Sequence, residues 1–253
     1  MNRMNRMVVP LMAAGLVLGG VNLASAAVIN PTDVQTSSDF FAAATGDPAN
    51  SSTPLLIDPA NLDADNLHIV DPFGSWLADG LVEPIPVDEQ WAYVDLGLGD
   101  NGFGYDLTTL RIWNYHERAP EGVETSGRSV AAFTLFMGSD GATTPVGPTA
   151  APFSSATGWS FVRNGVFAPG PLAAIPNETP LLAATDTFDL TGENFVRYIG
   201  IEIDTNVDGG ALVGLGHIQA EGTPSVPEPG GLALMVLAGL VATGFRRVAP
   251  RRR

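Results

Sequence analysis

Aromatic rings in loop-like stretches flanked by glycine and proline, together with arginines near strand ends, are the side chains of this sequence best suited to hold a ligand. The alternative for the arginines Arg118 and Arg128 is that they only add solubilising charge. Aromatic rings can stack on sugar rings while arginine and asparagine bind the hydroxyl groups, and a concave site needs only a few such groups. Tryptophans in strands more often fill a core, so we expect Trp91 and Trp113 inside the fold. The candidate ligand-binding residues are Trp76, Tyr105, Arg118, Arg128 and Trp159.

The sequence carries no recognisable catalytic motif. It lacks G-x-S-x-G, H-E-x-x-H and phosphate-loop patterns. It has no cysteine, which excludes thiolate metal sites and cysteine nucleophiles. Its three histidines, His68, His116 and His217, lie far apart and are never four residues apart. We therefore expect no enzyme, although the many carboxylates leave the acid–base pair of a glycoside-active enzyme open as an alternative.

The stretch 27–226 is strongly acidic. It holds 26 acidic residues against five arginines, a net charge of −21. Such a charge keeps a protein soluble and repels phosphate backbones and anionic lipid. Nucleic acid is therefore not an expected partner.

The first 26 residues have the three parts of a secretory signal peptide. Arg3 and Arg6 precede an apolar run over 7–21, and the small residues Ala24 and Ala26 stand at the −3 and −1 positions of a cleavage site. The apolar run is short for a membrane span, which needs roughly 20 residues. We expect cleavage after Ala26, with an uncleaved anchor or a buried helix as the alternative.

The C-terminal segment combines a proline motif, an apolar stretch and an arginine cluster. A Pro-rich linker covers 223–229, and the uncharged apolar stretch 230–245 predicts a marginal transmembrane helix. The tail 246–253 holds five arginines, which should stay in the cytoplasm. The residues of the proline motif are Pro227, Glu228 and Pro229.

This arrangement resembles the PEP-CTERM sorting signal of Gram-negative bacteria. The resemblance implies a transient partner, an exosortase that removes the tail, and a link to exopolysaccharide production. With the signal peptide it predicts export across the inner membrane as a membrane-anchored precursor, followed by a place on the cell surface or in the extracellular matrix. A simple tail anchor is the alternative.

Short strand signals separated by turn residues dominate 55–222, which predicts an all-β sandwich. The clearest strand covers 197–205, and further strands are expected over 91–96, 110–116, 129–138, 184–190 and 212–219. With a period of two residues, one face of a strand points to the core. The residues expected on inner faces are Ile199, Ile201 and Ile203 of the first strand and Phe133, Leu135 and Met137 of the strand 129–138.

The order of these pieces is similar to that of the discoidin, or F5/8 type C, family of galactose-binding-like jelly rolls. The stretches that carry the resemblance are 91–97, 110–115, 133–141, 197–201 and 213–218. It implies a sandwich of about eight strands over 55–222, preceded by an N-terminal extension over 27–54, with a ligand site in loops at one end. The family includes many carbohydrate-binding modules.

A structural calcium ion is a further implication of this resemblance. Many members of the family hold one with an acidic residue near the domain's start and a glutamate in the final strand, where this chain has His217. Calcium needs six to eight oxygen ligands, so the histidine argues against the usual site and leaves a shifted site as the alternative. The candidate ligands are Asp58, Asp63, Asp65 and Asp71.

The sequence thus predicts an exported surface protein whose β-sandwich binds carbohydrate, with the cell's own exopolysaccharide as the expected ligand. A structural matrix or adhesion protein without a specific ligand is the alternative from another class.

Overall fold

The computed structural model describes residues 25–38, 53–69, 75–78, 85–115, 126–168 and 181–226. Most of the signal peptide, the proline motif and the apolar tail lie outside these ranges, as do Asp71 and Arg118. Within them, no helix is long and apolar enough to cross a membrane.

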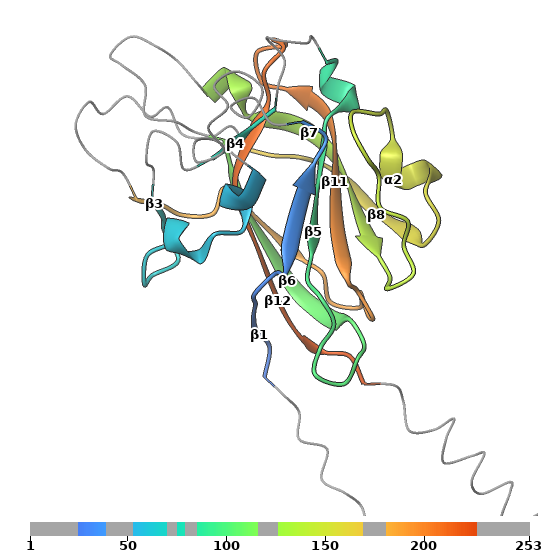
Figure 1. Ribbon diagram of the computed structural model, residues 1–253. Coiled ribbons are helices and arrows are strands. Elements are labelled where there is room, and N and C mark those ends of the chain that lie inside the picture. Colours follow the sequence, from blue (N-terminus) through green and yellow to red (C-terminus); the bar gives the residue numbers. More distant parts are fainter. Residues whose placement is uncertain are drawn as a thin grey trace, which may run out of the picture.

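Two antiparallel sheets of five strands each form a sandwich (Figure 1). In the first sheet the order is β1 (Ala27–Ile29), β12 (Gly214–Pro224), β6 (Tyr105–Asn114) and β10 (Asp186–Asp189), and β4 (Trp76–Leu77) also pairs with β12. The second sheet has the order β2 (Asp33–Thr36), β5 (Trp91–Asp95), β11 (Tyr198–Asn206), β7 (Val130–Gly138) and β8 (Trp159–Val166). The short strands β3 (His68–Ile69) and β9 (Leu181–Leu182) form a separate pair.

Helical elements are short in the described part of the chain. They are α2 and four 3-10 turns, and they lie between strands: η1 (Thr53–Leu56), η2 (Pro59–Asn61), η3 (Val87–Glu89), η4 (Ser126–Arg128) and α2 (Pro152–Ser155). The predicted all-β sandwich is therefore confirmed, with ten strands in its two sheets rather than about eight. β1 and β2 come from the stretch 27–54, so the sandwich begins at Ala27 and not near residue 55. These strands have three and four residues, too few for a period of two to stand out.

The core between the sheets contains the predicted inner faces. Ile199, Ile201 and Ile203 of β11 are buried there, and so are Phe133, Leu135 and Met137 of β7. All six predicted strands form, with boundaries that shift by a few residues. The largest shifts are at β6, which begins at Tyr105 instead of Leu110, and at β12, which ends at Pro224 instead of Gln219.

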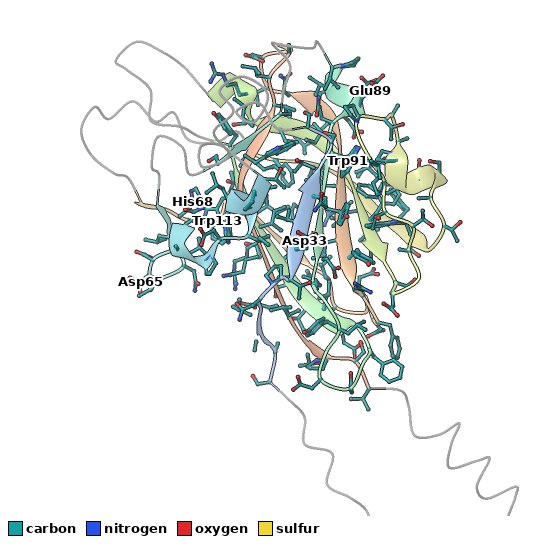
Figure 2. The ribbon with its side chains drawn as sticks, in the orientation of Figure 1. Asp33, Asp65, His68, Glu89, Trp91 and Trp113 are labelled. Carbon is teal, nitrogen blue, oxygen red and sulfur yellow. The ribbon has the colours of Figure 1, made fainter. Side chains whose placement is uncertain are left out.

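The central strands of the second sheet, β5, β7 and β11, also bury residues on their outer face. Trp91, Tyr93, Phe136 and Tyr198 point away from the main core and pack together with Phe153 of α2. The segment 139–158, which carries α2, covers this aromatic cluster (Figure 1). The Glu202 carboxylate holds the cover in place by accepting N–H bonds from Phe153 at 2.7 Å and Ser154 at 3.2 Å. Trp91 is thus buried as expected, but beneath a loop and not between the sheets (Figure 2).

The first sheet is covered on its outer face by the segment 53–69. His217 of β12 is buried there, with its ring centroid 5.4 Å from that of Trp113 and 6.0 Å from that of His68. Gln219 reaches Asn66 of the same segment at 3.5 Å. Burial lowers the pKa of His217 to about 4, against the opposing effects of a hydrogen bond to the Leu55 carbonyl and of the Asp58 charge. The imidazole is therefore neutral at physiological pH.

We expect the buried His217 to make folding sensitive to acid. Below a pH of about 6.5 the unfolded chain protonates this imidazole before the folded chain does, so the free energy of unfolding should fall as the pH drops towards 4. A pKa lowered to about 4 corresponds to roughly 3 kcal/mol across this range. Urea denaturation of the wild type and of His217→Gln at about pH 7 and about pH 4.5 measures it.

The Gln variant keeps a donor for the Leu55 carbonyl but does not titrate, so its stability should depend less on pH. Carboxyl groups such as Glu202 and Asp186, whose pKa values burial raises, titrate equally in both proteins and cancel in the difference. An equal pH dependence of wild type and variant would contradict the assignment.

Candidate functional site

A cleft of about 280 Å³ opens at the end of the sandwich where β7 ends and where β8 and β11 begin. Three segments that are distant in sequence form its walls: the end of β7, the start of β8 and the turn that precedes β11. Its lining residues are Met137, Gly138, Ser139, Gly158, Trp159, Ser160, Glu193, Asn194, Phe195 and Val196.

Trp159 forms a fixed aromatic wall of the cleft. Its indole N–H donates to the Thr143 carbonyl at 2.9 Å, and its ring packs on Phe153 with 4.4 Å between centroids. Gly200 makes this packing possible, because a Cβ atom there would lie 2.8 Å from the indole and 3.0 Å from the Phe153 ring. The indole is half-buried, so part of it stays open to the cleft.

Phe195, in the turn that also lines the cleft, is held in a left-handed backbone conformation with a φ of 58°. Positive φ is uncommon for residues other than glycine, and such strain persists where the surroundings enforce it, often at functional sites. Here its N–H donates to the Ser225 hydroxyl at 3.0 Å and, more weakly, to Asp106 at 3.4 Å, while Ser225 itself donates to Asp106. The ring is left 44% exposed.

Polar groups fill the space between the two aromatic walls. Ser139, Ser160 and Asn194 are exposed, and Glu193 is half-buried. Backbone bonds fix their positions: the Ser139 N–H donates to the Gly158 carbonyl at 3.1 Å, and the Glu193 carbonyl accepts from the Leu107 N–H at 2.9 Å. The cleft therefore combines aromatic surface with hydroxyl, amide and carboxylate groups, which can form hydrogen bonds with a polyhydroxylated ligand.

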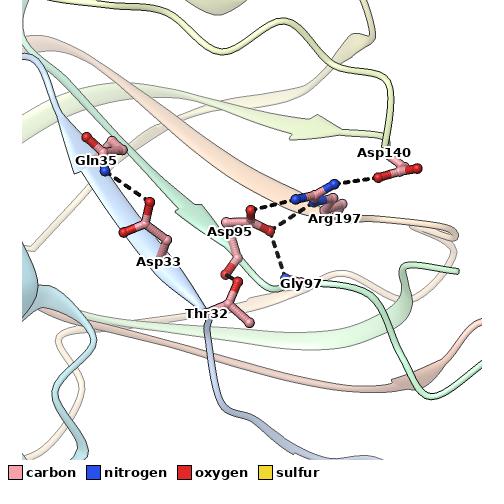
Figure 3. A network of polar contacts seen from close by, with 7 residues as sticks. All are labelled: Thr32, Asp33, Gln35, Asp95, Gly97, Asp140 and Arg197. Atoms are coloured by element: carbon pink, nitrogen blue, oxygen red, sulfur yellow. Dashed lines mark hydrogen bonds and ion pairs between the residues drawn. The ribbon is translucent and has the colours of Figure 1, made fainter. Parts of the chain in front are cut away.

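An arginine beside the cleft forms ion pairs with two carboxylates (Figure 3). Arg197 donates to both oxygens of Asp95, at 3.1 and 3.0 Å, and to Asp140 at 2.5 Å. These hydrogen bonds raise the pKa of the guanidinium above its ordinary value, which is already high. Asp140 belongs to the segment 139–158, so the network ties the start of this cover to β5 and β11.

The sequence-predicted ligand residues are scattered through the structure. Trp159 lines the cleft, although it begins a strand and not a loop. Tyr105 supports the cleft wall through two backbone hydrogen bonds with Val196, but its side chain packs against the main core. Arg128 ends η4 near the opposite end of the sandwich, and Arg118 lies outside the described residues.

The prediction that Trp76 lies at a binding surface is wrong. The side chain is fully buried in the main core, and its indole N–H donates to the Ser38 carbonyl at 2.9 Å. Flanking glycine and proline suggested a loop, but β4 pairs with β12 and carries this ring inward.

The aspartates proposed for calcium do not form a metal site among the described residues. Asp58 caps η2 through the Ala60 N–H at 2.9 Å, and Asp63 accepts from the N–H groups of Asp65 and Leu67 at 2.9 and 2.8 Å. Asp65 is exposed at the tip of this segment (Figure 2). No group of three or more acidic or histidine side chains in the described ranges is placed to hold a metal. The fourth candidate, Asp71, lies outside the described residues, so the calcium site stays a prediction.

Sequence reasoning missed the wall that contains Glu193, Asn194 and Phe195. The stretch 191–196 reads as a polar turn, and its function as a wall depends on Ser225, thirty positions after Phe195. The one local signal was a large aromatic ring within a polar turn that follows glycine.

No protein-family model matches the chain, and no curated protein matches it either. Solved structures with a similar arrangement include an F5/8 type C domain from Bacteroides fragilis (14% identity, 79% of this chain and 98% of that one, TM-score 0.41). Another is the family 32 carbohydrate-binding module of NanJ from Clostridium perfringens, in complex with galactose (11% identity, 78% and 99%, TM-score 0.39).

A family 89 glycoside hydrolase from Clostridium perfringens is also similar, at 14% identity and a TM-score of 0.39 over 79% of this chain. The chain spans only 15% of the length of that enzyme. TM-scores of this size show neither the family nor the function of this chain. Its fold is defined by its strand pairings.

The Arg197 network predicts unequal effects of removing its members. Arg197→Met leaves the largely buried Asp95 carboxylate without its cation, so we expect the free energy of unfolding to fall by about 1–3 kcal/mol. Asp140→Asn removes a carboxylate whose side chain is 61% exposed, and the loss should stay below about 1 kcal/mol. Denaturation midpoints of the two variants test the ranking, and equal losses would show that Asp140 matters as much as Asp95.

Proposed function

We propose that the β-sandwich binds carbohydrate in the cleft between Trp159 and Phe195. The observation that supports it is a rigid, partly exposed indole that faces hydroxyl, amide and carboxylate groups across a small concave space. The volume lies just below the range of typical small-molecule sites, about 300–1,000 Å³, and suits one sugar residue of a chain.

The charges favour a neutral saccharide over an acidic one. Glu193 is the charged residue of the described lining, and the guanidinium of the neighbouring Arg197 is occupied by Asp95 and Asp140. A ligand with uronate carboxylates would meet net negative charge without a cation to pair with. A glycosidase needs two carboxylates in its site. The described lining of the cleft contains one, Glu193, so binding is favoured over glycoside cleavage.

Export and sorting complete the proposal. Cleavage after Ala26 would leave β1 as the first residues of the mature chain, and β12 ends at Pro224, just before the proline motif at 227–229. The structured domain thus fits between the two processing signals. We propose that an exosortase recognises the motif and removes the apolar tail, and that the domain then acts at the cell surface or in the matrix of a Gram-negative bacterium.

The test of binding is a pair of variants on the same strand. Trp159→Ala removes the aromatic wall, and we expect the affinity for a neutral polysaccharide to fall at least about tenfold, or roughly 1.4 kcal/mol. Phe161→Ala is the matched control, because Phe161 is 60% exposed on β8 but does not line the cleft. Affinity electrophoresis against a polysaccharide panel that includes the producer's exopolysaccharide, with calcium and with chelator, gives the measurement.

Equal losses in both variants would place the ligand outside the cleft. If the folded wild type binds no polysaccharide in either condition, the cleft has no saccharide ligand, and a structural matrix protein becomes the better description.

Processing is tested separately by the mass of the exported protein. Intact-mass analysis of protein recovered from the cell surface should show a chain that starts at Ala27 and lacks 230–253. A mass that retains the C-terminal segment would refute the exosortase step and leave carbohydrate binding untouched.

A further inference from the structure

Four large apolar side chains are exposed at the end of the sandwich. At this end β1 begins and β12 ends (Figure 1). Leu98 and Phe103 are 41% and 42% exposed in the loop between β5 and β6, and Phe195 and Val226 are 44% and 68% exposed. We call this group the apolar end.

Contacts between three segments make the apolar end continuous. The rings of Phe103 and Phe195 meet edge to face with centroids 6.3 Å apart. The Ser225 N–H donates to the Gly104 carbonyl at 2.8 Å, and the Asn101 side chain donates to the Ser225 carbonyl at 2.5 Å. The loop that carries Leu98 and Phe103 is therefore bound to the last residues before the C-terminal segment. Contiguous exposed apolar side chains mark interaction sites.

The sequence after Val226 shows what is attached to the apolar end. Only Pro227, Glu228 and Pro229 separate it from the apolar stretch 230–245, which five arginines follow. A linker of this length reaches at most roughly 14 Å even when fully extended. If the apolar stretch enters a bilayer, the apolar end is held within roughly 14 Å of the hydrocarbon core.

We propose that, while the C-terminal segment is attached, the apolar end rests on the outer surface of the lipid bilayer. The inference rests on the membrane-anchored precursor of the proposed function and adds an orientation to it. Asp100, at the tip of the same loop, and Glu193, beside Phe195, carry negative charge, so the surface that fits is zwitterionic and not anionic. Apolar side chains enter the boundary between headgroups and acyl chains to a depth of about 5–10 Å.

The absence of cysteine from the whole chain allows a direct test. Nitroxide labels are attached to single cysteines in the full chain, reconstituted in vesicles of zwitterionic phospholipid. Leu98→Cys and Phe103→Cys probe the apolar end. Val207→Cys is the control, because Val207 is also 41% exposed but follows the far end of β11. Circular dichroism confirms that each labelled variant is folded.

At Leu98 and Phe103 we expect accessibility to a water-soluble relaxing agent to fall roughly tenfold relative to Val207, and accessibility to oxygen to rise. Adding anionic lipid should not strengthen this contrast. Equal water accessibility at all three positions in protein that floats with the vesicles overturns the inference and leaves the membrane anchor standing.

Failure of the full chain to float after alkaline washing refutes both the anchor and the inference. Label-to-label distances that pair the apolar ends of two molecules also overturn the inference, since a second copy of the chain would then cover this surface.

Discussion

The burial of both faces of the second sheet is the constraint on which the rest of this structure depends. One face of β11 presents isoleucines to the core between the sheets, and the other presents Tyr198, Gly200 and Glu202. The aromatic side chains on the outer face would be unfavourable in contact with water, so this face needs a covering segment. The segment 139–158 supplies that cover, with Phe153 inserted among the rings and its backbone bound to Glu202.

The cleft follows from how that cover is attached. The segment leaves β7 at Gly138 and returns to the sheet at Trp159, so its two ends lie side by side at the end of the sandwich. Arg197 holds the first end through Asp140, and the aromatic cluster holds the second through the indole of Trp159. The turn before β11 then closes the opposite side, with Phe195 kept in its strained conformation by Ser225 and Asp106. Rigid walls of this kind reduce the entropy lost when a ligand binds.

The same end of the molecule joins the cleft to the chain termini. Ser225 supports Phe195, and it is also the next-to-last described residue before the proline motif. The first sheet is covered for the same reason as the second, because its outer face also carries aromatic rings that are buried away from water. There the segment 53–69 covers Trp113 and His217. Within this segment Asp58 and Asp63 stabilise turns by accepting backbone N–H bonds.

By itself the sequence determined the strands, their inward faces and the acidic character of the domain, because alternation and charge are local properties of neighbouring residues. It also carries the signals expected to direct export, which are linear by nature. Only the tertiary structure decided that Trp76 lies in the core, that Trp91 lies under a loop, and that Trp159 and Phe195 line the same cleft. When a segment distant in the chain buries a side chain, neither segment shows this in the periodic pattern of its sequence. The cleft therefore depends on the pairing of β7 with β8 and β11 and on the folding of their connecting segments over the sheet, neither of which is encoded in a local sequence pattern.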